Sequence, residues 1–331
     1  MRCLTLADAM AQRGWQAHFA CNAADGFDFS VVARRGHHLH TVPPFSDWRE
    51  DARATATLAV ELQPRWLVVD HYRLDASWER ACGQASERLC VIDDLADRPH
   101  ESALLFDSGL HRQREAYAPH VAAGCRLYCG PDFALLRPAF ASLRAESLRR
   151  RAEAAGPQRL LRAMGGVHAS TVTGAVLDVI SPVLNRHELA LDVVLGSSAP
   201  HLASIETQLA QTGFAARLHI DLPDLASLMA QSDIAIGASG GTALERLCLG
   251  LPSLVLSLAD NQPPAARAIA ARGAGLYAGH VREPGWQDRL RAGLEGWLAD
   301  PGGLRAVSAL GGALVDGQGA PRMAELLHVY V

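Results

Sequence analysis

The stretch that decides the fold of this 331-residue chain is "DIAIGASGGTALERLCLGLPSL", residues 233–254. Its apolar run 234–236 predicts a buried strand, small residues follow, and a helix is expected to open near Thr242. Unpaired backbone N–H groups and the helix dipole then meet at one spot, which attracts phosphate. A strand, a glycine loop and a helix in this order indicate an α/β fold with a ligand site at the carboxyl edge of its sheet.

The side chains of this loop indicate what the phosphate belongs to. Gly240 and Gly241 allow close backbone approach, and Ser239 and Thr242 add hydroxyl donors. Glu245, one turn into the expected helix, can accept both hydroxyls of a ribose. The alternative is a glycine-rich turn before a buried helix, with Glu245 in solvent.

Short apolar runs alternate with helical patterns on both sides of this stretch, as in parallel sheets that are buried on both faces. The expected strands are 66–70, 89–93, 159–164, 191–195, 234–236 and 253–257, and an opening helix precedes a strand at 17–21. The sequence therefore predicts two α/β blocks.

A helical, arginine-rich segment that ends at Gly156-Pro157 separates the two blocks. We expect an N-terminal Rossmann-like domain at 1–140, a linker helix at 141–156, and a C-terminal domain at 157–312 that carries the phosphate loop. A last helix lies within 313–331 and is expected to pack back on the first domain. Two such domains facing a cleft suit a ligand with two chemically distinct halves.

Composition excludes several classes of function. The net charge of −4 gives no basic excess to follow a nucleic acid, and no apolar stretch reaches membrane-spanning length. The chain has no lysine, so Schiff-base, pyridoxal phosphate and P-loop chemistry are absent. Seven scattered cysteines favour reduced thiols and a cytoplasmic protein.

A second glycine turn, Gly165-Gly166 in "RLLRAMGGVHAS", follows the strand at 159–164. At that position it can meet the other side of the same phosphates. Its alternative is an ordinary turn.

Polar residues follow two strands of the first block. Asp70, His71 and Tyr72 come directly after one strand, where they can orient a sugar or a reacting water. Alternatively, Asp70 caps the next helix and Tyr72 packs. Asp93 and Asp94 follow another strand, but adjacent residues point in opposite directions, which favours loop hydrogen bonding over a metal site.

Two further groups of residues have a plain alternative. Asn261 and Gln262 precede two prolines that stiffen the backbone, so their amides can address a hydroxyl-rich ligand or simply lie in a surface turn. His37, His38 and His40 lack a carboxylate or cysteine at ligand spacing, so we expect a surface loop and no metal.

Seven segments together resemble the UDP-2,4-diacetamido-2,4,6-trideoxy-β-L-altropyranose hydrolases of pseudaminic acid biosynthesis, in the same order over nearly the whole chain. They are VDHYRLDASWE (69–79), IDDLADRPH (92–100), LYCGPDFALLRPAF (127–140), Met164–Gly166, GASGGTALERLCLGLPSL (237–254), LADNQ (258–262) and VDGQGAPRM (315–323). The resemblance implies the two-domain glycosyltransferase-B fold, related to MurG-type GlcNAc transferases. It also implies hydrolysis of the UDP-sugar with inversion and without metal or cofactor.

Carried over to this chain, the resemblance places the UDP pyrophosphate and ribose on residues 237–245, with Glu245 on the ribose diol. The residues it places at the sugar end are Asp70, His71, Tyr72, Asn261 and Gln262. The chain departs from the family at four places. Ser239 and Gly241 stand where glycine and serine are usual, Leu244 replaces a common tryptophan, and Val167-His168 replaces Ser-Asp.

In the family, residues like the opening "MRCLTLADAM" follow a first strand and a G-x-G-H loop whose histidine is taken as the general base. We expect that the reading frame starts about 15–20 residues upstream, so that the N-terminal domain lacks its first strand here. Within the chain, His71 and Tyr72 are the catalytic candidates.

The sequence thus predicts a monomeric UDP-sugar hydrolase whose activity depends on the missing histidine. One alternative is a UDP-sugar-dependent glycosyltransferase, which would pass the sugar to an acceptor instead of water. Another is a non-catalytic protein that binds UDP-sugar without turnover.

Overall fold

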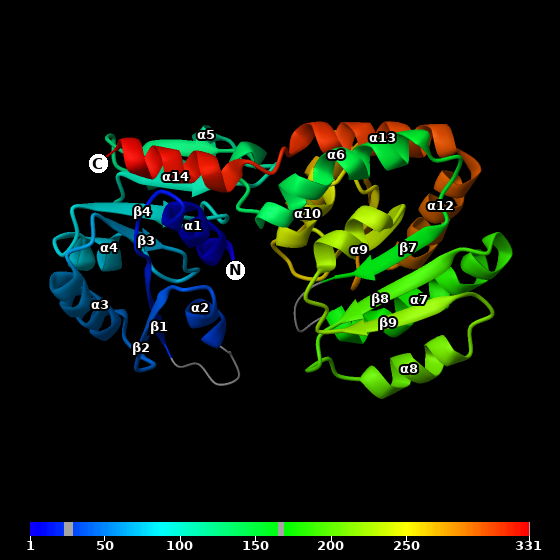
Figure 1. The fold of residues 1–331 in the computed structure, drawn as a ribbon, viewed down its shortest axis with the longest axis horizontal. Coiled ribbons are helices and arrows are strands. Elements are labelled where there is room, and N and C mark those ends of the chain that lie inside the picture. Colours follow the sequence, from blue (N-terminus) through cyan, green and yellow to red (C-terminus); the bar gives the residue numbers. More distant parts are fainter. Residues whose placement is uncertain (23–28, 165–168, 331) are drawn as a thin grey trace. The chain divides into compact units, whose positions relative to one another are not determined.

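The computed structural model describes residues 1–22, 29–164 and 169–330, without the side chains of 169–171. These residues form two compact units. The first comprises Met1–Leu136 and Gln318–Val331, and the second Arg137–Gly317 (Figure 1).

The second unit is built on a six-stranded sheet of order β12-β11-β10-β7-β8-β9, in which all neighbours are parallel. Its strands are β7 (Arg159–Ala163), β8 (Ala190–Leu195), β9 (Ala216–Ile220), β10 (Ile234–Ala238), β11 (Ser253–Ser257) and β12 (Leu276–His280). The chain runs outward from β7 in one direction and outward from β10 in the other. The order therefore reverses between β7 and β10, and ligands of open α/β sheets bind beyond the carboxyl ends of strands at such a point.

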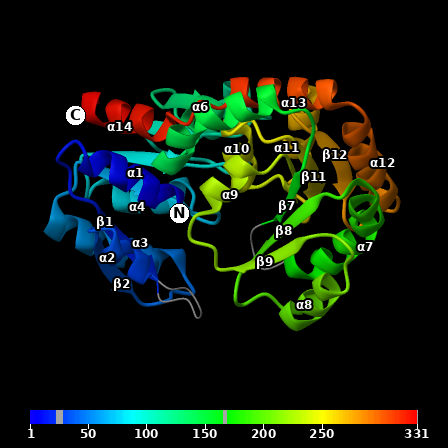
Figure 2. The ribbon, with the colours of Figure 1, turned by 45° about the vertical axis from the view of Figure 1, so that its right-hand side comes forward.

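Helices cover both faces of this sheet. One face carries α7 (Ala169–His187), α8 (Leu202–Ala210) and α12 (Trp286–Ala299), whose apolar residues pack on the strands. The other helices are α6 (Pro138–Glu153), α9 (Leu225–Gln231), α10 (Gly241–Cys248), α11 (Pro263–Ala271) and α13 (Pro301–Leu314). Among these, α6 contacts α9, α10 and α13 (Figure 2). Burial on both faces explains why the strands are almost wholly apolar.

The first unit has two separate parallel sheets. One pairs β1 (His18–Asn22) with β2 (His38–Val42). The other has the order β3-β4-β5-β6, with strands β3 (Trp66–Val69), β4 (Arg88–Ile92), β5 (Leu104–Asp107) and β6 (Arg126–Cys129). The first strand that we expected ahead of Met1 lies outside this sequence and stays a prediction.

Alternating side chains of β4 and β5 divide the core of the first unit. Cys90 and Ile92 face α1 (Arg2–Ala11) and α14 (Gly319–Val329), whereas Leu89 and Val91 face α3 (Trp48–Leu62) and α4 (Ala76–Gly83). The chain's last helix is thus part of the first unit, because Leu327 and its neighbours fill the apolar layer beside α1. The remaining elements of the unit are α2 (Ser30–Arg34), α5 (Arg114–Tyr117), η1 (Ala118–His120) and η2 (Pro131–Phe133).

The α/β class with parallel sheets is confirmed. The helix that we expected as a linker lies within the second unit, where Arg150 and Arg151 donate to backbone carbonyls at the end of α9. Sequence patterns missed β2, β5, β6, β9 and β12, which are short or carry polar residues.

Candidate functional site

The loop between β10 and α10 follows one of the two strands at which the strand order reverses. The strand ends at Ala238, Gly240 is the residue before the helix, and α10 begins at Gly241. In the described part of the chain, the N–H groups of Gly240, Gly241 and Thr242 have no acceptor. A methyl group at either glycine would meet nothing within 4 Å. Three N–H donors at a helix N-terminus therefore face open space, which suits an anion.

A buried arginine lies beneath this loop. The guanidinium of Arg246 donates to Thr242 Oγ1 at 3.2 Å, to the Ala238 carbonyl at 2.6 Å and to Ser253 Oγ at 2.9 Å. Burial lowers its pKa to about 10. Gly237 makes room for it, since a Cβ there would lie 2.5 Å from Arg246 Nη1. Sequence analysis missed Arg246, although its spacing of four residues from Thr242 on a helix is a usable signal.

Glu245 is half-buried one turn into α10. It has no hydrogen bond or ion pair among the described residues, so its carboxylate oxygens are available to a ligand. Burial raises the pKa of Glu245, while the charges of Arg137 and Arg246 oppose that rise. The position agrees with a role as an acceptor and differs from the fully solvated side chain of the alternative.

The loops after β10 and β11 are hydrogen-bonded to each other. Ser239 Oγ donates to the Gln262 carbonyl at 2.9 Å, and Gln262 Oε1 accepts the Leu258 N–H at 2.8 Å. The Ser239 hydroxyl hydrogen, which we expected to serve phosphate, is therefore engaged within the protein. Asn261 is exposed, and Pro263 begins α11.

The structure gives no test of the phosphate contact that we expected at the second glycine turn. Gly165 and Gly166 lie outside the described residues, as do Val167 and His168. The preceding strand β7 is adjacent to β10, with Leu161 opposite Ala235.

In the first unit, Asp70 is held by an arginine that sequence analysis did not single out. Arg2 Nε donates to the two carboxylate oxygens of Asp70 at 3.0 and 2.9 Å, and Arg2 Nη1 donates to Asp94 Oδ2 at 2.9 Å. Burial alone would lower the pKa of Arg2, but the two carboxylates raise it above its usual value. Helix α4 is capped by Asp75 and not by Asp70. Arg2 thus links the ends of two neighbouring strands.

The two catalytic candidates differ in their surroundings. His71 Nδ1 accepts the Arg73 N–H at 3.1 Å, so the ring proton lies on Nε2 and this conformation offers a donor and no basic nitrogen. Burial lowers the pKa of His71. Tyr72 is 58% exposed, and its hydroxyl lies 3.4 Å from Asp94 Oδ2.

Asp93 has the loop hydrogen bonds expected of it, accepting the N–H groups of Leu95 and Ala96 at 2.9 and 2.8 Å. Arg98 Nη2 forms an ion pair with Asp93 Oδ1 at 2.8 Å. The Tyr117 hydroxyl lies 2.9 Å from Asp93 and 2.8 Å from Asp107. Because one hydroxyl has a single hydrogen, it cannot donate to two ionised carboxylates. Burial raises the pKa of Asp107, while the Gly109 N–H, the Tyr117 hydroxyl and the charge of Arg112 oppose that rise.

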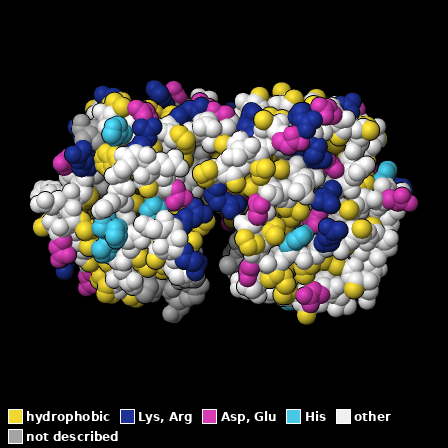
Figure 3. Space-filling model, viewed as in Figure 1, with side chains coloured by type: hydrophobic (Ala, Val, Ile, Leu, Met, Phe, Trp, Pro, Cys, Tyr) yellow, Lys and Arg dark blue, Asp and Glu magenta, His cyan; other side chains and the backbone are white. Residues whose placement is uncertain are grey.

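The surface loop that we expected for His37, His38 and His40 is wrong in part. His38 and His40 lie on strand β2, where His18 of β1 stacks on His38 at a centroid distance of 4.4 Å. His18 Nδ1 and His40 Nε2 are 2.9 Å apart, and histidine side chains gather on this part of the first unit in Figure 3. Among the described residues, no group of three or more histidine, cysteine or acidic side chains could hold a metal ion.

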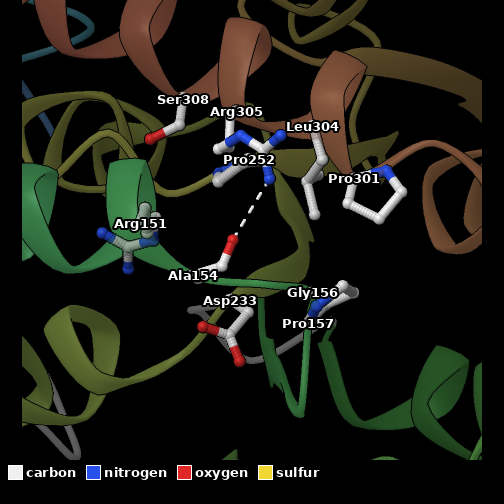
Figure 4. Close-up of a pocket in the computed structure, with 10 residues that line it drawn as sticks. All are labelled: Arg151, Ala154, Gly156, Pro157, Asp233, Pro252, Pro301, Leu304, Arg305 and Ser308. Atoms are coloured by element: carbon white, nitrogen blue, oxygen red, sulfur yellow. Dashed lines mark hydrogen bonds between the residues drawn. The ribbon is translucent and has the colours of Figure 1, made fainter.

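A pocket in the second unit lies at the opposite edge of the sheet, before the strands begin. It is lined by Pro157, Asp233 and Pro252 together with residues of α6 and α13 (Figure 4). Two of its charged side chains are engaged within the protein, since Asp233 accepts two backbone N–H groups and Arg305 donates to the Ala154 carbonyl at 3.1 Å. We assign no ligand to it.

Comparisons with known proteins give a fold and two partial relatives, and no family model matches the chain. The spore coat polysaccharide biosynthesis protein SpsG of Bacillus subtilis (strain 168) is 30% identical over 160 residues, which are 48% of this chain and 46% of SpsG. The UDP-N-acetylglucosamine–N-acetylmuramyl-(pentapeptide) pyrophosphoryl-undecaprenol N-acetylglucosamine transferase of Xylella fastidiosa (strain M12) is 28% identical over 182 residues, 52% of this chain and 48% of the transferase. The chain spans about half the length of these curated relatives.

Among solved structures, MurG of Acinetobacter baumannii is similar with a TM-score of 0.70 and 12% identity, over 99% of this chain and 95% of MurG. The expected two-domain glycosyltransferase-B fold is thereby confirmed. At this identity the likeness concerns the fold alone. Within the part of the chain that the structure describes, no helix is long and apolar enough to cross a membrane.

Proposed function

We propose that this chain is a UDP-sugar-dependent enzyme and that its second unit binds the UDP diphosphate on the β10–α10 loop. The observation that carries the proposal is the set of three unpaired N–H groups at Gly240, Gly241 and Thr242, where the strand order reverses. Glu245 would accept the ribose hydroxyls with its unpartnered carboxylate. Gly165 and Gly166 stay candidates for the other side of the phosphates.

The same donors can assist the reaction. When the bond between the anomeric carbon and the UDP oxygen breaks, negative charge grows on the leaving diphosphate. Fixed N–H groups at a helix N-terminus stabilise that charge without rearranging, and so lower the barrier. The loop of the second unit would therefore bind the substrate and also stabilise the departing group.

We assign the sugar to Asp70, Tyr72, Asn261 and Gln262 as a proposal. Asp70 has an ordered carboxylate because Arg2 holds it, and Tyr72 offers an exposed hydroxyl. Asn261 is exposed too, and the Gln262 amide nitrogen has no partner among the described residues. His71 is a poor general base in this conformation, since Nδ1 already accepts a hydrogen bond.

Transfer of the sugar to an acceptor hydroxyl is the reaction that the comparisons support better. The Xylella relative is named as an N-acetylglucosamine transferase, and the MurG fold matches nearly the whole chain. A second candidate is hydrolysis of UDP-2,4-diacetamido-2,4,6-trideoxy-β-L-altropyranose with inversion. The seven resembling segments favour it, and the resemblance places its general-base histidine outside this sequence.

The test is to measure binding of UDP by calorimetry and then UDP release from UDP-GlcNAc and from the altropyranose nucleotide. Release that requires an added hydroxyl acceptor, with the sugar's mass added to that acceptor, would support transfer. Release of free sugar without acceptor would support hydrolysis. Binding without release would favour the non-catalytic protein, and absence of UDP binding would refute the proposal.

A further inference from the structure

We propose that Arg246 is a positioning residue that presents the Thr242 hydroxyl, as a hydrogen-bond donor, to the diphosphate of a ligand on the β10–α10 loop. The inference rests on the proposed function and deepens it, because it concerns a residue that the ligand does not touch. The distinguishing feature is a fully buried guanidinium that contacts both ends of the loop.

The direction of one hydrogen bond decides the role of Thr242. An arginine only donates hydrogen bonds, so at 3.2 Å from Arg246 Nη1 the Thr242 oxygen must be the acceptor. Its own hydrogen is then free for another acceptor, and no described residue takes it. A hydroxyl that accepts from a cation is also a stronger donor. Beside the three unpaired N–H groups of Gly240, Gly241 and Thr242, it forms a fourth donor.

The same guanidinium holds the loop in shape. It donates to the carbonyl of Ala238, the last residue of β10, and to the side chain of Thr242 in the first turn of α10. Its third hydrogen bond, to Ser253 Oγ, connects these two ends of the loop to the start of β11. Residues 239–241 are therefore fixed at their two ends by one side chain.

The charge of Arg246 is compensated only weakly within the protein. All three of its hydrogen-bond acceptors are uncharged oxygens, and Glu245, the adjacent residue, forms no ion pair with it in the described part of the chain. Burial accordingly lowers its pKa to about 10. A buried cation without an anionic partner is unfavourable, and a diphosphate on the loop would supply the missing negative charge.

A second buried arginine provides a matched control. Arg151 also donates to uncharged oxygens, those of Met229, Ser232 and Leu249, and burial lowers its pKa to about 9. It lines the pocket at the opposite edge of the sheet, away from the β10–α10 loop (Figure 4). Replacing Arg151 therefore removes a comparable side chain without touching the loop.

The experiment compares UDP with uridine, which lacks the phosphates, by isothermal titration calorimetry on the full chain. Arg246→Met should weaken UDP binding by about tenfold or more, about 1.4 kcal/mol at tenfold, and leave uridine binding unchanged. Arg151→Met should leave the UDP affinity of the folded protein unchanged. A structural role alone would lower the affinities for both ligands together.

If Arg246→Met does not fold, a second pair of variants tests whether the Thr242 hydroxyl contributes to UDP binding. Thr242→Val removes the hydroxyl at nearly constant volume and should weaken UDP binding, whereas Thr242→Ser should bind UDP like the wild type. If the wild type binds UDP and both Arg246→Met and Thr242→Val bind it equally well, the role of Arg246 is refuted while the proposed function stands. If the wild type does not bind UDP, the proposed function fails and this inference with it.

Discussion

Gly237→Ala is the substitution whose outcome follows most directly from the packing beneath the loop. Gly237 lies in β10, and a Cβ built there would be 2.5 Å from Arg246 Nη1, 2.7 Å from its central carbon and 2.8 Å from the Ala163 carbonyl oxygen. The carbonyl belongs to the neighbouring strand β7 and cannot move without moving the sheet. The guanidinium is held by three hydrogen bonds.

The expected cost combines overpacking with a weakened hydrogen bond. Overpacking of a dense core costs about 1–3 kcal/mol, and displacement of the guanidinium would cost about 1 kcal/mol for each hydrogen bond lost. Replacing glycine by alanine recovers about 0.4–1 kcal/mol by restricting the unfolded chain. We expect Gly237→Ala to lower the free energy of unfolding by about 2 kcal/mol.

Gly241→Ala is the matched control, since the added methyl group meets nothing within 4 Å and the position is helical. It should leave stability unchanged or raise it by up to about 1 kcal/mol. Urea unfolding followed by circular dichroism, with separate transitions fitted for the two units, measures both. Equal stability of Gly237→Ala and the wild type, or an equal loss in Gly241→Ala, would refute the packing argument.

Three further predictions concern carboxyl groups. Glu245→Ala should weaken UDP binding about 10- to 100-fold, as expected for charged hydrogen bonds, and spare 2′,3′-dideoxy-UDP; equal losses for both ligands would exclude contact with the ribose. Because burial raises the pKa of Asp107 above its ordinary 3.8, the stability it contributes is complete below that pH and is lost as the pH rises through the folded pKa. Asp107→Asn removes the titrating carboxyl, so urea titrations above about pH 4 should show a smaller loss of unfolding free energy than in the wild type, and parallel profiles would contradict a raised pKa of Asp107. Glu79→Ala should cost about 3 kcal/mol, because it leaves the buried His100, now 2.6 Å from the carboxylate, without its partner; a loss below about 1 kcal/mol in thermal or urea unfolding would contradict this.

Local sequence patterns were sufficient to predict those strands and helices whose boundaries are set by residues within one short segment. The strand 253–257 agrees with β11, and the expected helix near Thr242 begins one residue earlier, at Gly241. Both depend on apolar runs and glycine positions, which act within a few residues. The same local signals predict an anion site at the loop 239–242, and that role stays a prediction.

Contacts between distant segments could not be identified in this way. Arg2 and Asp70 are 68 positions apart, and Ser239 and Gln262 are 23 apart. The sequence showed each of these residues as polar and near a strand end, but not its partner. The Ser239 hydroxyl therefore looked free for phosphate, although the fold directs it to a carbonyl.

By itself, the sequence determined the alternation of strands and helices, the parallel α/β class and the position of the glycine loop before α10, because burial periodicity and backbone constraints are local. Only the tertiary structure decided that α6 belongs to the second unit and that Arg246 lies under the loop. A helix with an apolar face must be buried, but the face does not specify which layer covers it. A buried charge is likewise tolerated only where the fold brings its hydrogen-bond acceptors together, and those acceptors come from separate elements of the chain.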